Sequence, residues 1–79
     1  MSKSAATAQK VVTALETARE LSFQLAQAMR DAQAAIEEDG TAGMNIGRVI
    51  AASGAVNLVE STVITELTAW QGYLRARLN

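Results

Sequence analysis

The clearest turn signal in the chain is Asp39-Gly40-Thr41-Ala42-Gly43-Met44-Asn45. Gly40 has no Cβ and can take the left-handed conformation that commonly ends a helix. Asn45 can cap a second helix, because its side-chain oxygen can accept from a free amide of the first turn. The stretch therefore predicts a turn over residues 39–45 between two helical halves.

Residues before the turn follow a heptad pattern. Apolar or small residues recur at alternating steps of four and three: Val11, Leu15, Ala18, Ser22, Leu25, Met29, Ala32 and Ile36. Such spacing places one stripe along a helix, and most of the intervening residues are strong helix formers. We predict a helix over residues 4–38, with Ser2 or Ser4 as its N-terminal cap.

Residues after the turn keep the same spacing and predict a helix over residues 46–78. The stripe is Ile46, Val49, Ser53, Val56, Glu60, Val63, Leu67, Trp70 and Leu74. Several β-branched residues between 56 and 65 also suit a strand. We favour a helix, because a lone strand would leave its backbone groups without partners. A break at Gly54 or over residues 60–62 stays open at this level.

Two helices of equal length joined by a short turn predict an all-α fold, an antiparallel two-helix hairpin forming one domain over residues 1–79. A chain of 79 residues with no cysteine has no disulfide to add to a small core. Both predicted helices also carry apolar residues outside the stripe, such as Leu21, Phe23 and Leu58. We expect self-association into a four-helix bundle or a larger helical oligomer, a dimer being the first choice.

Composition argues against several function classes. The chain has no histidine and no cysteine, so it lacks the usual bases, nucleophiles and soft metal ligands of enzymes. With a net charge of −1, the chain lacks the excess of basic residues that nucleic-acid binding needs. We therefore expect a protein that is not an enzyme, carries no cofactor and binds no nucleic acid.

Carboxylates are the remaining candidates for chemistry. Glu16 and Glu20 lie four residues apart, on one helix face, and Glu60 could join them from another helix. This set is an alternative hypothesis, a metal- or ligand-binding bundle, although bundle sites of that kind usually include histidines. A solvated acidic surface is the simpler interpretation, so we assign no catalytic, cofactor-binding or metal-binding residue.

Glu60 falls on the apolar stripe between Val56 and Val63. A carboxylate buried there needs a charged partner or a shifted pKa. Arg19 or Arg48 could supply the positive charge, and the pair would then set the register of the helices. A Glu60 side chain that reaches water at the edge of the stripe is the simpler alternative.

Membrane and export signals are weak. The most apolar segment, residues 49–59, lies between Arg48 and Glu60 and is shorter than the roughly 20 residues of a spanning helix. The N-terminal residues do not follow the pattern of a secretory signal peptide. We expect a cytoplasmic protein that does not bind membranes, with non-classical export left open.

These patterns favour a non-enzymatic interaction or assembly module, a self-associating hairpin that serves as an adaptor, a chaperone-like protein or a structural subunit. A small phage-type regulator or inhibitor of a host protein is an alternative, in which the partner is a different protein. Trp, Tyr and Arg are enriched in binding hot spots, which makes Tyr73 a good candidate contact. The candidate interface residues are Val11, Leu15, Leu25, Met29, Val56, Glu60, Val63, Leu67, Trp70, Tyr73 and Leu74.

Overall fold

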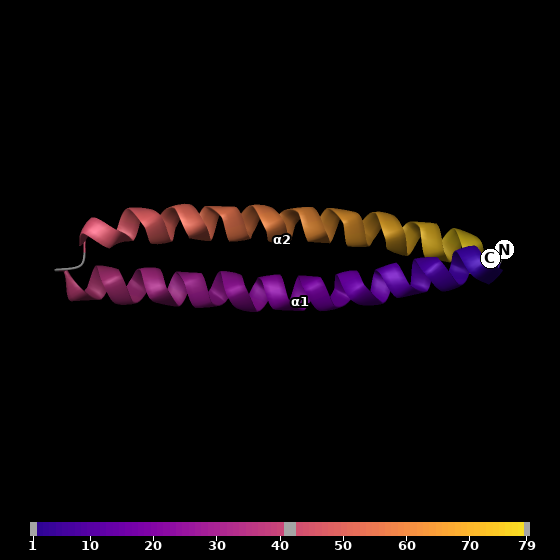
Figure 1. Cartoon of the computed structure of the whole chain (residues 1–79), viewed down its shortest axis with the longest axis horizontal. Coiled ribbons are helices and arrows are strands. Elements are labelled where there is room, and N and C mark those ends of the chain that lie inside the picture. The colour runs from indigo at the N-terminus through magenta and orange to yellow at the C-terminus, as the bar shows by residue number, and fades with distance from the viewer. Residues whose placement is uncertain (1, 41–42, 79) are drawn as a thin grey trace.

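The protein is an antiparallel pair of long helices. The computed structural model describes residues 2–40 and 43–78, and the side chains of residues 4–40 and 46–78. Helix α1 spans Ser2–Asp39 and helix α2 spans Gly43–Leu78. The two lie side by side along a rod of 59 × 14 × 14 Å, with both chain ends at one tip and the turn at the other (Figure 1). The predicted all-α hairpin is confirmed.

The turn begins as the sequence predicts. Gly40 has a φ of 70°, and its N–H donates to the carbonyl of Ile36 at 3.4 Å. This is the single hydrogen bond of a left-handed helix end. Residues 41–42 lie outside the described part of the chain.

Two of the predicted capping residues, Ser4 and Asn45, are not caps because the helices begin before them, whereas the side chain of Ser2, the other candidate cap of the first helix, lies outside the described residues. Helix α1 already begins at Ser2, so Ser4 lies within its first turn. Helix α2 begins at Gly43, so Asn45 lies within the first turn of that helix. Gly40 keeps its predicted role in ending a helix.

Helix α2 is continuous through the region where a strand or a break stayed open. Its threonines bond back along the helix: the hydroxyls of Thr62, Thr65 and Thr68 donate to the carbonyls of Leu58, Ser61 and Ile64 at 2.8, 3.0 and 3.0 Å. Such bonds to the residue four positions earlier satisfy the hydroxyl without leaving the helix. The β-branched run is therefore compatible with an uninterrupted helix.

The contact line between the helices follows the predicted stripe along all of α2, and on α1 it keeps the predicted positions Leu15, Ala18, Ser22, Met29 and Ile36. At the other predicted positions it lies one residue later, since Val12 is buried and Val11 is half-buried. Leu25 is 51% exposed, whereas Ala26 is 1% exposed. Ala32 is likewise exposed and Gln33 is half-buried. In a helix of 3.6 residues per turn, a residue four positions later is rotated by about 40° and one three positions later by about 60° in the opposite direction, so either can continue the line. The prediction that Leu25 and Ala32 lie on the contact line is therefore wrong.

The buried core is small and lies toward the tip that holds the chain ends. It consists of Ala8 and Val12 from α1 with Leu67 and Leu74 from α2. Leu15 and Trp70 pack against it while staying half-buried. Among the described side chains, no large one is fully buried. A core this thin gives the isolated hairpin little apolar stabilisation.

Two glycine substitutions are expected to act in opposite directions. A Cβ at Gly54 would meet nothing within 4 Å, so Gly54→Ala should raise the free energy of unfolding by about 0.5–1 kcal/mol through helix propensity. Gly40→Ala should lower it by about 1 kcal/mol, because its φ of 70° strains a residue with a side chain. Thermal unfolding followed by circular dichroism measures both. A destabilising Gly54→Ala would mean that this glycine packs closely against another chain.

Candidate functional site

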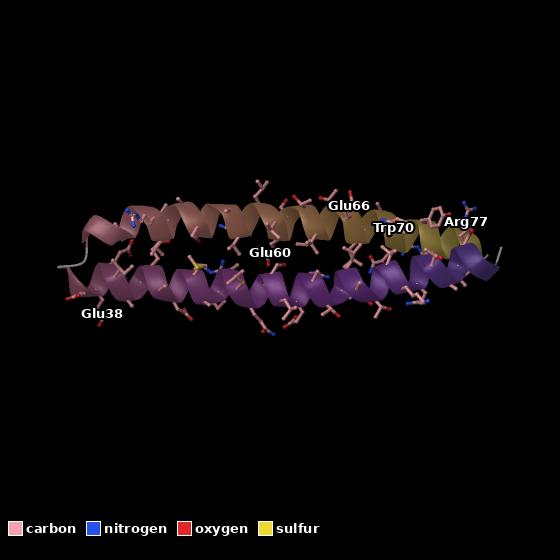
Figure 2. The ribbon with its side chains drawn as sticks, in the orientation of Figure 1. Glu38, Glu60, Glu66, Trp70 and Arg77 are labelled. Atoms are coloured by element: carbon pink, nitrogen blue, oxygen red, sulfur yellow. The ribbon has the colours of Figure 1, made fainter. Side chains whose placement is uncertain are left out.

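One side of the hairpin carries an open groove of about 520 Å³ near mid-length, lined by both charged and apolar residues. We call it the polar groove, lined by Glu16, Arg19, Glu20 and Phe23 from α1 and by Glu60, Ile64, Leu67 and Gln71 from α2. Glu60 is half-buried and lies on the side of α2 that faces α1, whereas Glu38 lies on the outer side of α1 (Figure 2). The groove therefore forms where polar residues interrupt the apolar contact line.

Glu60 shares this groove with Arg19, one of its two predicted partners, and Arg48 is not among the lining residues. No salt bridge within 4.0 Å joins acidic and basic side chains in the described part of the chain. The neighbouring Ser22 is buried, and its hydroxyl donates to the Arg19 carbonyl at 3.0 Å. The middle of the contact line thus holds a satisfied hydroxyl and a carboxylate open to the groove.

The three carboxylates of the metal hypothesis do line one groove. They do not converge, since no group of three acidic residues in the described chain is arranged to hold a metal ion. Glu20 instead accepts from the Gln24 side chain at 3.0 Å, along its own helix. The groove is open to water, and its arrangement presents no preorganised chemistry.

An aromatic cluster lies near the other end of α2. The rings of Trp70 and Tyr73 meet edge to face, with centroids 5.4 Å apart and planes at 65°. The Arg77 guanidinium lies 4.4 Å from the Tyr73 ring centroid, a cation–π contact. Trp70 and Arg77 both lie toward the tip with the chain ends (Figure 2). The contacts hold Tyr73, which is 39% exposed, in a fixed orientation.

A row of apolar residues runs along each helix at one edge of the contact line, combining half-buried residues of that line with exposed residues next to it. On α1 the row is Val11, Ala14, Ala18, Leu21, Leu25, Ala28, Ala32 and Ala35. On α2 it is Val49, Ala52, Val56, Val59, Val63, Trp70 and Tyr73, with Glu66 as the one charged residue at the same spacing. Leu21, Leu25 and Val59 are 58%, 51% and 55% exposed. We call these two rows together the apolar face.

The two rows lie on the same side of the hairpin, opposite the polar groove. Thr7, one heptad before Ala14, lines a shallow depression together with Trp70 and Tyr73. In contrast, Phe23 lines the polar groove with Ile64. Because Phe23 and Leu21 project from opposite flanks of α1, the polar groove and the apolar face lie on opposite sides of the hairpin, and the groove side also exposes Phe23 and Ile64.

The predicted interface residues divide into three groups. Leu67 and Leu74 are buried within the hairpin, so their surface is already used. Leu25 and Tyr73 are exposed on the apolar face, and a further group is half-buried along the contact line: Val11, Leu15, Met29, Val56, Glu60, Val63 and Trp70. The candidate list omitted Leu21 and Val59. A second heptad row, offset from the first, is the sequence signal that contains both.

The comparisons with known proteins supply no relative. No known family model matches the chain, and neither a curated protein nor a solved structure shows significant similarity to it. Over their described residues, the helices do not combine the length and apolar content that crossing a membrane requires.

Replacing the half-buried carboxylate should stabilise the hairpin. Glu60→Leu is expected to raise the free energy of unfolding by about 1 kcal/mol, because a leucine would continue the apolar contact line between Val56 and Val63. Glu20→Leu, at an exposed position in the same groove, is the control and should have little effect. Urea unfolding measures both, and a destabilised Glu60→Leu would show that the Glu60 carboxylate forms a favourable ion pair.

Proposed function

We propose that this protein is a non-enzymatic assembly module that self-associates through its apolar face, forming a four-helix bundle from two hairpins. The observation that carries the proposal is a face along both helices on which Leu21, Leu25, Val59 and Tyr73 are exposed. Large exposed apolar surfaces on proteins commonly mark interaction sites.

The surface area of the single chain supports this proposal. The hairpin exposes 5657 Å² of accessible surface, about 1,100 Å² more than the roughly 4,600 Å² expected for a compact monomer of its 8.3 kDa mass. Each partner in a standard protein interface buries about 800 Å². One interface of ordinary size would therefore account for most of the excess.

Self-association would also add buried apolar surface to a hairpin whose own core is small. The four core residues Ala8, Val12, Leu67 and Leu74 lie toward one tip, and the turn-proximal half has mainly small or half-buried residues along its contact line. A second hairpin would cover the apolar face over the full length of the rod. In the assembly, the polar groove remains outside the interface and is the surface left for a further protein.

The native mass across a dilution series tests self-association directly. Light scattering after gel filtration should give twice the 8.3 kDa chain mass at high concentration. Helical circular dichroism should fall as the dimer dissociates, because folding and association are coupled in so small a core. A monomeric mass with full helicity at every concentration would contradict the proposal.

A matched pair of substitutions locates the interface. Leu25 on the apolar face and Phe23 on the groove side are 51% and 54% exposed, so neither substitution should disturb the hairpin itself. Leu25→Glu should weaken association on the order of tenfold or more, since it would bury an unpaired carboxylate. Phe23→Glu should leave association unchanged. Equal effects from both variants would mean that the apolar face is not the interface.

A further inference from the structure

Side-chain size changes along the α2 row of the apolar face. Trp70 and Tyr73 lie near the tip with the chain ends, and Ala52 and Val49 lie near the turn. Trp70 and Ala52 are equally far from residue 61, and so are Tyr73 and Val49. A second α2 reversed about residue 61 would therefore place each bulky ring against a smaller side chain, which is how packed layers interdigitate.

The α1 row is compatible with a reversal about Leu21. Ala14 and Ala28 are equally far from Leu21, so two small residues meet there, and the reversal brings Leu25 to within one residue of Ala18. Leu21 meets its own copy at the centre.

Both centres of reversal lie at the same level of the hairpin. Glu20 and Phe23 flank Leu21 in the sequence, Glu60 immediately precedes residue 61, and these three side chains line the same groove. Residue 21 on α1 is thus beside residue 61 on α2. One two-fold axis, crossing the rod at this level, therefore relates both rows to their copies.

The charges at the two tips favour the same orientation. At the tip with the chain ends, the described side chains of residues 4–15 and 67–78 include Lys10, Arg75 and Arg77 and no acidic side chain. At the turn, the described side chains of residues 31–40 and 46–47 include Asp31, Glu37, Glu38 and Asp39 and no basic side chain. A reversed second copy brings each basic tip close to an acidic one, whereas turns placed together would bring like charges together.

The size of the apolar face suits one further copy. A face of 59 by 14 Å covers about 800 Å², the area that each partner contributes to an interface of standard size. A C2 contact also uses the same surface on both partners, as the self-complementary rows require.

We propose that a second copy of this chain covers the apolar face head to tail, the turn of each hairpin lying over the chain ends of the other, with a two-fold axis near Leu21. This inference rests on the proposed self-association and specifies its geometry. In the resulting bundle α1 packs antiparallel on the partner's α1, and α2 on the partner's α2. Trp70 and Tyr73, held by Arg77, pack against the alanine-rich surface of the partner near its turn.

Engineered disulfides test the axis, because the chain has no cysteine of its own. Leu21→Cys should form a disulfide-linked dimer under mild oxidation, since only a residue near the axis meets its own copy closely enough for a disulfide. Phe23→Cys lies at the same level on the opposite face and is the control for random collision. Linkage of Leu21→Cys no greater than that of Phe23→Cys would overturn the proposed axis.

A mixed pair tests the orientation. Chains carrying Ala14→Cys and chains carrying Ala28→Cys should link to each other in a mixture far more than either links to itself. In a turn-to-turn dimer, α1 would instead face the partner's α2, and Ala28→Cys would link to Ala52→Cys. That second result would overturn the head-to-tail arrangement.

Native mass and salt dependence separate failure of the geometry from failure of the proposed function. A doubled native mass without the 21–21 and 14–28 links means that the chain self-associates with a different geometry. A monomeric mass would contradict both the proposed function and this inference.

Raising the salt concentration above about 0.1 M, where the Debye length is below about 10 Å, should weaken the dimer several-fold. A dimer that tightens with salt would contradict the pairing of opposite tips.

Discussion

Each helix of a two-helix hairpin has only one neighbour, and the rest of the structure depends on this constraint. A single neighbour can cover one narrow line of side chains, and among the described side chains that line buries only five apolar residues, Ala8, Val12, Ala26, Leu67 and Leu74. The apolar surface of each helix is broader than this contact line and is only partly buried by it. What remains outside the line becomes an exposed row on each helix, and the antiparallel connection places both rows on the same side.

The contact line itself is not purely apolar. Ser22 and Ser53 are buried in it, and Glu60 is half-buried between them and the polar groove. Ser22 satisfies its hydroxyl within its own helix, so it fills the line without requiring a partner from α2. Polar residues at the middle of the line reduce the stability of the isolated hairpin. They also disfavour sliding of one helix along the other, because such a slip would bring Glu60 against an apolar neighbour.

The two sides of the hairpin differ in what they can do. The groove side gathers Glu16, Arg19, Glu20 and Glu60 around an opening that is accessible to water, where charged groups are well solvated. The other side combines aliphatic rows with an edge-to-face aromatic pair and a cation–π contact at one tip. Rigid aromatic side chains lose little conformational entropy on binding. The proposed self-association relies on these features of the second side.

The sequence alone determined the two helices, the turn and the left-handed Gly40, because helical periodicity and turn chemistry are local properties. It also located the α2 contact line correctly from Ile46 to Leu74. Only the tertiary structure decided that Ala26, and not Leu25, faces α2, since residues three and four positions after Ser22 are rotated to opposite sides of the contact line and the position of α2 selects between them. The tertiary structure likewise placed the Leu21 row and the Trp70 row on one face. Which flanks of two helices lie on the same side depends on the direction and the rotation of each helix relative to the other. The periodicity of a single helix gives neither of these.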